Sequence, residues 1–289
     1  LGQESIAEKA WNDIKELNLF LTEINIEAIN VEMVQNLLRS SLSSTKRKIA
    51  GQFSTPKKLA NLISRLTIQN KNKIVIDPCC GTGTIINEVY KIKEEYGLNQ
   101  NQILDTTWAS DKHSFPIQMS TMTMSKPNNI GKIINIFKSD IIELNEGKKI
   151  EFRNPNNGKI VNKYFPKIDY IISNLPFIKS KELKILNPEI FNINEWIKST
   201  TNSNESLSGK SDFFVYLPFY IYNLLSSDGK IGLILSNAWL GSEYGKLFIN
   251  KLQIFYKIKI ILVSGEGKWF KNTDVVTSII IASKKGVNE

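Results

Sequence analysis

Four polar residues stand where short apolar segments of the sequence end: Asp77, Asp111, Asp140 and Asn174. Three are carboxylates, which accept hydrogen bonds from hydroxyl, amine or ammonium groups, and the fourth is an amide, which both donates and accepts. A single aspartate at a strand end is often only a helix cap. Four such residues, one after each segment, instead predict a common site, because ligands of open α/β sheets bind outside the carboxyl ends of the strands.

Asp77 opens the glycine-containing turn "DPCCGTG", residues 77–83. Gly81 and Gly83 allow the backbone to turn sharply and to approach a ligand closely. Two glycines alone are a weak signal, but the carboxylate changes what the turn can bind. Asp77 repels a pyrophosphate and attracts an ammonium group. The turn therefore favours S-adenosylmethionine, which carries an ammonium group and no phosphate, over a dinucleotide.

The residue types present exclude several kinds of site. The sequence has one histidine, His113, and its only cysteines, Cys79 and Cys80, are adjacent. This set does not provide the ligands of a zinc site, and adjacent cysteines seldom form a disulfide. We therefore predict no bound metal, chemistry without a histidine base, a surface helix position for His113 and a reducing, cytoplasmic location. No apolar run is long enough to span a membrane, so we expect no membrane association.

The formal net charge of the chain is +9 at pH 7. A basic balance suits a nucleic-acid partner, whose phosphates attract lysine and arginine. Only four of the basic residues are arginine, and the rest are lysine in a chain rich in asparagine and isoleucine. That composition also fits a coding bias, so the charge alone does not decide the partner.

Strand-like and helix-like segments alternate from about residue 73 onward. Apolar runs ending near residues 77, 111, 140 and 174 and at 231–236 predict strands, and the intervening patterns predict helices near 84–96, 115–124 and 213–225. Residues 258–265 and 277–285 have the pattern of a closing antiparallel pair. Residues 144–167 and 178–210 interrupt the alternation, the first as a predicted hairpin insertion and the second as a long loop at the ligand edge. The alternation predicts an α/β fold with a parallel, doubly wound sheet.

Residues 1–44 have a different character from the rest of the chain. Their apolar residues recur near helical spacing, and the polar stretch "SSLSSTKRK" follows them. We predict a small N-terminal helical unit over 1–44 that serves as a connector or docking unit. Residues 45–289 then form the main domain.

Several stretches of the sequence together resemble a known enzyme family. The turn "DPCCGTG" resembles motif I of the amino-group DNA methyltransferases, and "SNLPF", residues 173–177, resembles their motif IV, Asn-Pro-Pro-aromatic. The segment "GQFSTPKKLANLI", residues 51–63, resembles the motif that precedes motif I in the gamma class of adenine-specific enzymes. Residues 210–246 and 268–285 resemble the downstream part of the same family. The resemblance covers about residues 46–286 and is strongest to type I modification subunits and single-chain type II restriction-modification enzymes.

The resemblance implies a fold and a set of cofactor contacts. The fold is the Rossmann-like class I methyltransferase fold, with a seven-stranded, mostly parallel, doubly wound sheet. The aspartates have separate implied roles: Asp111 accepts hydrogen bonds from the ribose hydroxyls of S-adenosylmethionine, and Asp140 accepts one from its adenine amine. The remaining implied contacts are Phe53, Thr55 and Pro56 at the methionine end, Asp77, Pro78, Gly81 and Gly83 in the glycine turn, and Ile141 against the adenine ring.

The same resemblance assigns "SNLPF" to catalysis. The exocyclic amine of an aromatic base is a poor nucleophile, because its lone pair is delocalised. Acceptors at the Asn174 side-chain oxygen and the Leu175 backbone carbonyl would direct that lone pair toward the methyl group. Pro176 would fix the turn, and Phe177 would stack on the base after it leaves the duplex. The family usually has proline where this chain has Leu175. We expect this departure to loosen the turn, and a return to proline to leave activity equal or higher.

The implied activity is methylation of adenine in double-stranded DNA as part of a restriction-modification system. Such enzymes read sequence with a target recognition domain, for which 45–289 leaves no residues. We therefore expect either a specificity subunit as partner or a missing C-terminal recognition domain. Two alternatives remain at this point: methylation of an amine in RNA or of a protein glutamine, and an inactive methylase fold that only binds DNA.

Overall fold

The computed structural model describes residues 54–286 apart from positions 187, 203, 208, 266 and 271–274. The helical unit predicted for residues 1–44, and Phe53 of the predicted cofactor site, lie outside the described residues. Among the helices that are described, none has the length and apolar character that crossing a membrane requires.

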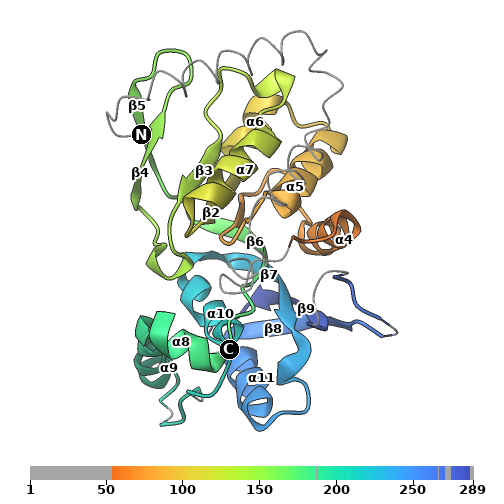
Figure 1. Cartoon of the computed structure of the whole chain (residues 1–289), viewed down its shortest axis with the longest axis vertical. Helices are drawn as coiled ribbons and strands as arrows, with labels where there is room; N and C mark the ends of the chain where they lie inside the picture. The colour runs from red at the N-terminus through yellow and green to blue at the C-terminus, as the bar shows by residue number, and fades with distance from the viewer. Residues whose placement is uncertain are drawn as a thin grey trace, which may run out of the picture. The chain divides into compact units, whose positions relative to one another are not determined.

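The main domain is built on a seven-stranded sheet with the order β3-β2-β1-β6-β7-β9-β8 (Figure 1). The first five strands in this order are parallel to one another, and β9 runs antiparallel to both of its neighbours. The sheet confirms the predicted parallel, doubly wound arrangement and the closing antiparallel pair. Its strands are β1 (Val75–Asp77), β2 (Thr107–Asp111), β3 (Asn135–Lys138), β6 (Ile168–Asn174), β7 (Leu225–Ser236), β8 (Tyr256–Val263) and β9 (Thr277–Lys284).

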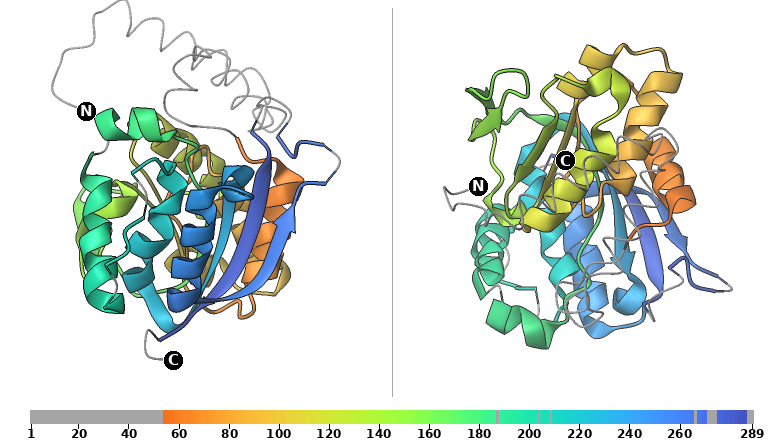
Figure 2. Two further views of the ribbon diagram at one scale, coloured as in Figure 1. Left: turned by 90° about the horizontal axis from the view of Figure 1, so that it is seen from below. Right: turned by 45° about the horizontal axis from the view of Figure 1, so that its top comes forward.

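Helices cover both faces of the sheet. The helix α4 packs across β6, β7 and β9 with α5 beside it, whereas α11 packs on the opposite face (Figure 2). Side chains of β7 alternate between these two layers, since Ile234 joins the α4 side and Leu233 and Leu235 join the α11 side. The α-helices are α4 (Lys57–Thr67), α5 (Thr84–Glu95), α6 (Gln100–Asp105), α7 (Ser114–Met124), α8 (Ser180–Leu186), α9 (Ile193–Thr201), α10 (Leu217–Tyr220) and α11 (Glu243–Phe255).

The predicted insertion after β3 is a two-stranded antiparallel hairpin, β4 (Lys149–Arg153) and β5 (Ile160–Tyr164). Its inner face carries Phe152, which meets Trp108 of β2 and Phe137 of β3 edge to face at centroid distances of 6.2 and 6.4 Å. Such aromatic pairs contribute about 0.5–1.5 kcal/mol beyond area burial. The hairpin thus covers β2 and β3 on the same face of the sheet on which α11 packs.

The segment 213–225 differs from the single long helix that its apolar spacing predicts. The structure has a 3₁₀ turn at Phe213–Val215, the short helix α10 and a second 3₁₀ turn at Ile221–Leu224. Pro218 lies inside this segment and lacks the amide hydrogen that a continuous helix needs. The predicted turn "SSDGK" also lies within the bounds of β7, where the pairing register shifts between Ile168 and Tyr170 of β6.

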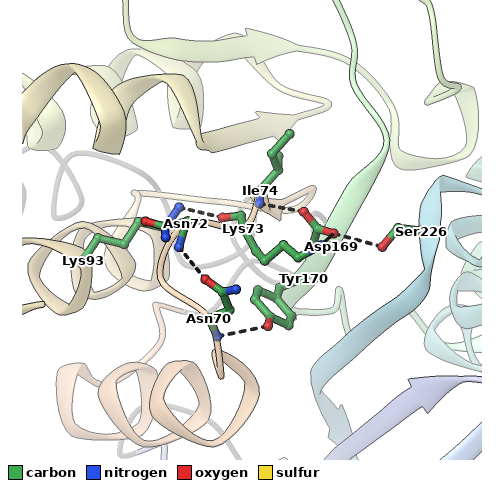
Figure 3. A network of polar contacts seen from close by, with 8 residues as sticks. All are labelled: Asn70, Asn72, Lys73, Ile74, Lys93, Asp169, Tyr170 and Ser226. Carbon is green, nitrogen blue, oxygen red and sulfur yellow. Dashed lines mark hydrogen bonds and ion pairs between the residues drawn. The ribbon is translucent and has the colours of Figure 1, made fainter. Parts of the chain in front are cut away.

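A polar network joins the central strands near their amino ends (Figure 3). The four polar residues of the predicted site lie at the opposite, carboxyl ends of the strands. Asp169 of β6 accepts hydrogen bonds from the Ile74 backbone amide and from the Ser226 hydroxyl, at 2.9 and 3.0 Å, and pairs with Lys73 Nζ at 3.1 Å. The buried ammonium of Lys93 on α5 donates to the Lys73 carbonyl at 2.9 Å. These contacts join Lys73 and Ile74, which directly precede β1, to β6, β7 and α5.

Candidate cofactor and catalytic site

The structure brings the four predicted polar residues to one edge of the sheet. Asp77, Asp111 and Asn174 are the last residues of β1, β2 and β6, and Asp140 lies two residues beyond the end of β3. The strand register aligns these ends, since Asp77 pairs with Ala109 of β2 and Asp111 pairs with Lys138 of β3. The prediction of a shared edge is therefore confirmed, while the role of each residue stays a prediction.

The glycine turn between β1 and α5 needs its two glycines for different reasons. Both have left-handed backbone angles, with φ of +52° at Gly81 and +83° at Gly83. A Cβ at Gly83 would lie 2.7 Å from Ser120 Oγ, so that residue is small because α7 packs against it. A Cβ at Gly81 would meet nothing within 4 Å. The backbone at Gly81 therefore borders open space, as a ligand-binding turn requires.

Asp77 is a buried carboxylate, 1% exposed. Its Oδ1 accepts hydrogen bonds from Ser173 Oγ at 2.7 Å and from the Cys79 backbone amide at 3.2 Å. Burial raises the pKa of Asp77 to about 7, against the opposing effect of these two donors. Within the described part of the chain Asp77 has no ion pair. A carboxylate that is buried without an ion pair fits a ligand that brings a positive charge.

Asp111 faces the glycine turn from β2. Its Oδ2 accepts from the Gly81 backbone amide at 3.1 Å, and its Oδ1 accepts from the His113 backbone amide at 2.9 Å. Burial raises the pKa of Asp111 above its ordinary value. Each carboxylate oxygen retains further acceptor capacity, which suits a ligand with vicinal hydroxyl groups. Together with Asp77, this carboxylate fits the ribose and ammonium groups of S-adenosylmethionine.

Asp140 caps the 3₁₀ turn Ile141–Glu143 through the Ile142 amide, with an Oδ1 to nitrogen distance of 3.3 Å. Its Oδ2 pairs with Lys112 Nζ at 2.8 Å. Lys112, which the sequence gave no reason to select, therefore neighbours this carboxylate. Ile141 is 4% exposed and belongs to the core cluster that includes Trp108, whereas Pro78 is buried directly after Asp77.

Asn174 is joined to the segment before α4. Its Nδ2 donates to Thr55 Oγ1 at 3.1 Å, although the two residues are 119 positions apart. Thr55 is 8% exposed, and the neighbouring Pro56 directly precedes α4. On β7, Gly232 leaves room for α4, because a Cβ there would overlap Thr67. The packing of α4 on β7 thus brings a predicted cofactor residue against the predicted catalytic amide.

At Leu175 the structure differs from the expectation that a leucine in place of the family's proline loosens the turn. Its backbone amide donates to the Ile234 carbonyl of β7 at 3.1 Å, a bond that proline cannot make. Its side chain is 1% exposed and packs in the same core cluster as Ile171. The residue therefore extends the β6–β7 pairing past Asn174. A return to proline would remove this hydrogen bond, so the expectation of equal or higher activity loses its structural basis.

Phe177 and Pro176 complete the "SNLPF" segment and are both partly exposed. The ring of Phe177 meets Phe270 edge to face, with centroids 6.2 Å apart and an interplanar angle of 89°. Phe270 is 3% exposed and lies in the segment between β8 and β9. Sequence reasoning missed Phe270 and Ser173 as site residues. Their only signals were the positions of Ser173 within "SNLPF" and of Phe270 within "KWFKN".

Comparisons with known proteins place these features in a family. Residues 32–289 match the family model described as N-6 DNA Methylase. A relative, the type II methyltransferase M.AccI of Acinetobacter calcoaceticus, is 23% identical over 251 residues, which are 86% of this chain and 39% of that protein. The chain thus spans well under half the length of this curated relative.

Solved structures share the fold at low sequence identity. A Listeria monocytogenes protein described as a class I S-adenosylmethionine-dependent methyltransferase aligns with a TM-score of 0.61 and 16% identity, over 99% of this chain and 78% of that one. The methyltransferase subunit of a type I restriction-modification system from Streptococcus thermophilus aligns with a TM-score of 0.58 and 16% identity, over 88% of this chain and 48% of that one. These likenesses show the class I methyltransferase fold for the described sheet and its helices.

Proposed function

Because the chain belongs to the N-6 DNA methylase family, we propose that it transfers a methyl group from S-adenosylmethionine to the exocyclic amine of adenine in double-stranded DNA. The observation that carries the proposal is the direct contact between the two halves of the site. Ser173 of "SNLPF" donates to Asp77 of the glycine turn at 2.7 Å. A cofactor held at the carboxylates of β1 and β2 would therefore lie beside Asn174.

The carboxylates would hold the cofactor through its polar groups. Asp77 attracts the ammonium group, which returns a compensating charge to a buried carboxylate. Asp111 accepts from the ribose hydroxyls while the Gly81 and His113 amides hold it in place. Asp140, partly neutralised by Lys112, accepts from the adenine amine at the edge of β3. When bound, the cofactor supplies a methyl group on a sulfonium.

Asn174 and the Leu175 carbonyl would activate the target amine by orientation. Both are hydrogen-bond acceptors at the end of β6, and the amide nitrogen of Asn174 is anchored at Thr55, so its oxygen lies at the other corner of the amide. Acceptors bonded to the amine hydrogens draw the nitrogen lone pair toward the methyl carbon. The sulfonium would give up its methyl group to the amine nitrogen and keep the electron pair of the broken carbon–sulfur bond, and the extra amine proton would pass to water. This chemistry needs no charged base.

Phe177 would receive the base after it leaves the duplex. Stacking of a base on an aromatic side chain is worth about 1–3 kcal/mol, which helps to offset the unstacking of the flipped nucleotide. The perpendicular contact with Phe270 restricts the orientation of the Phe177 ring. We further propose that the chain works within a restriction-modification system, which the name of the Streptococcus thermophilus structure mentions, and that a specificity subunit or a further recognition domain reads the DNA sequence.

The test is methyl transfer from labelled S-adenosylmethionine by the assembled enzyme to unmethylated duplex DNA, with RNA and glutamine-containing protein as parallel substrates. We expect N6-methyladenine as the product and labelling of DNA alone. Asn174→Ala should lower kcat by about 10²–10³-fold, because one preorganised acceptor is lost, and should leave cofactor affinity unchanged. Asn162→Ala, on the exposed face of the β4–β5 hairpin, is the matched control. Labelling of RNA or protein instead of DNA, or full activity of Asn174→Ala, would refute the proposal.

A further inference from the structure

We propose that the catalytic turn, defined as Ser173, Asn174 and Leu175, is held in its reactive geometry by three hydrogen bonds to three separate elements, and that Thr55 and Ser173 are positioning residues of the reaction. The inference rests on the proposed methyl transfer and deepens it. Hydrogen bonds of this chain would then supply the rigidity that a proline at position 175 would otherwise give the turn.

The first hydrogen bond anchors the amide of Asn174. A primary amide carries a donor corner and an acceptor corner, and only the acceptor corner can bind an amine hydrogen. Asn174 Nδ2 lies 3.1 Å from Thr55 Oγ1, so the donor corner is held at the segment that leads into α4. Thr55 is itself buried, at 8% exposure. The hydroxyl of Thr55 therefore restricts rotation of the catalytic amide.

The second hydrogen bond attaches the side chain of Ser173 to the glycine turn. Ser173 is fully buried and donates to Asp77 Oδ1 at 2.7 Å. The same oxygen accepts the Cys79 backbone amide, so Asp77 is fixed from its own turn as well. Any displacement of Ser173 along β6 would break a short hydrogen bond between two buried groups, and such groups are expensive to leave without partners.

The third hydrogen bond replaces the restriction that a proline ring would impose. The Leu175 amide donates to the Ile234 carbonyl of β7 at 3.1 Å, and Ile234 is fully buried. Proline at position 175 would leave that carbonyl without this donor. The Leu175 carbonyl, the second proposed acceptor for the amine, belongs to the residue whose amide is held. Both acceptors are thus fixed to the frame of the domain.

The first experiment separates positioning of Asn174 from cofactor binding by Thr55. Thr55→Val removes the hydroxyl and keeps the shape of the side chain, and Thr55→Ser restores the hydroxyl. In the assembled enzyme at saturating cofactor, Thr55→Val should lower kcat by about 10²-fold, because misplaced reacting groups lose about that much rate, while KM for S-adenosylmethionine stays unchanged. Thr55→Ser should recover most of the rate. Thr201→Val on α9, whose hydroxyl donates to the Ile197 carbonyl of the same helix, is the control. A raised KM with unchanged kcat would overturn the assignment.

The second experiment compares two serine–aspartate hydrogen bonds at opposite edges of the sheet. Ser173→Ala removes the bond to Asp77, and Ser226→Ala removes the bond to Asp169 at 3.0 Å (Figure 3). Both changes delete one hydroxyl that bonds to a carboxylate. Ser173→Ala should lower kcat, whereas Ser226→Ala should lower thermal stability without lowering kcat. Equal effects of the two changes on kcat would show that Ser173 acts only through general stability.

The third experiment uses the chain without ligand and does not depend on methyl transfer. Leu175→Val keeps the backbone amide, and Leu175→Pro removes it. Leu175→Pro should lower Tm by at least about 2 °C more than Leu175→Val, since about 1 kcal/mol corresponds to 2–4 °C in a domain of this size. Thr55→Val and Asn174→Ala should lower Tm non-additively, because their side chains share one bond. Equal Tm values for the two Leu175 variants together with additive shifts would overturn the inference. An inactive wild-type enzyme would reject the proposed function and leave these measurements valid.

Discussion

The buried carboxylate of Asp77 leads to a quantitative prediction about stability and cofactor binding together. Burial raises its pKa from an ordinary 3.8 to about 7. One pKa unit corresponds to about 1.36 kcal/mol, so ionising this group in the ligand-free fold is disfavoured by about 4 kcal/mol. The folded chain thus retains, between about pH 4 and pH 7, a proton that the unfolded chain loses. The stabilisation from this group is complete below about pH 4 and is lost as the pH rises through about 7.

Asp77→Asn should therefore stabilise the ligand-free chain above pH 7. The amide oxygen can still accept from Ser173 and from the Cys79 amide, while the charge is gone. We expect Tm at pH 8 to rise by several degrees, with about 4 kcal/mol as the upper bound, and the difference from wild type to shrink toward pH 4. The same change should abolish binding of S-adenosylmethionine, because the attraction for its ammonium is lost. Such an exchange of stability for function is common at binding sites.

The assay is differential scanning calorimetry of wild type and Asp77→Asn at pH 4, 6 and 8, with isothermal calorimetry of the cofactor at pH 8. Asp228→Asn, at an exposed position of β7, is the control for removing an aspartate charge. The reasoning is refuted if Asp77→Asn has the same Tm difference from wild type at pH 4 and at pH 8. It is also refuted if the variant binds S-adenosylmethionine as tightly as wild type does.

Three further predictions test other parts of the site and its support. Asp111→Ala should weaken binding of the cofactor, since hydrogen bonds to a charged group contribute about 1.5–3 kcal/mol each. Unchanged affinity in calorimetry would reject the ribose assignment. Gly83→Ala should lower Tm more than Gly81→Ala, because both have positive φ but only the first would place a Cβ 2.7 Å from Ser120 Oγ; the reverse order in thermal unfolding would contradict this. Lys93→Met should lower stability by about 1–3 kcal/mol, because its oxygen acceptors lose a donor, with cofactor affinity unchanged; a loss of affinity would contradict the separation of the two sheet edges.

The local parts of this fold could be predicted from the sequence because they depend on local physics. A short apolar segment followed by a polar residue is sufficient to indicate a buried strand end, and β1 and β2 are buried along their whole length. The glycines of "DPCCGTG" indicate a tight turn because few other residues adopt positive φ. The alternation of these segments with helical patterns predicts a parallel sheet, and parallel strands place Asp77, Asp111 and Asn174 at one edge. The location of the candidate site at the carboxyl ends of the strands could therefore be predicted from the sequence.

Local pattern failed where tertiary packing overrode it. The apolar spacing of 213–225 predicted one helix, but that segment is buried almost throughout and is broken around Pro218 to fit the core. Leu175 looked like a weakened turn because the sequence shows only the missing ring. The compensating acceptor belongs to Ile234, nearly sixty residues later. Its position depends on the register of β6 and β7, which no local window of the sequence contains.

What the sequence by itself determined is which residues lie at the ends of strands and which chemistry their side chains allow. What only the tertiary structure decided is which of them touch: Thr55 with Asn174 across 119 positions, and Ser173 with Asp77 across 96. The physical reason is the range of the forces involved. Backbone preferences and hydrophobic periodicity act within a few residues along the chain, whereas a hydrogen bond requires two atoms to lie about 3 Å apart. Only the packing of α4, β1 and β7 around β6 brings these distant atoms to that separation.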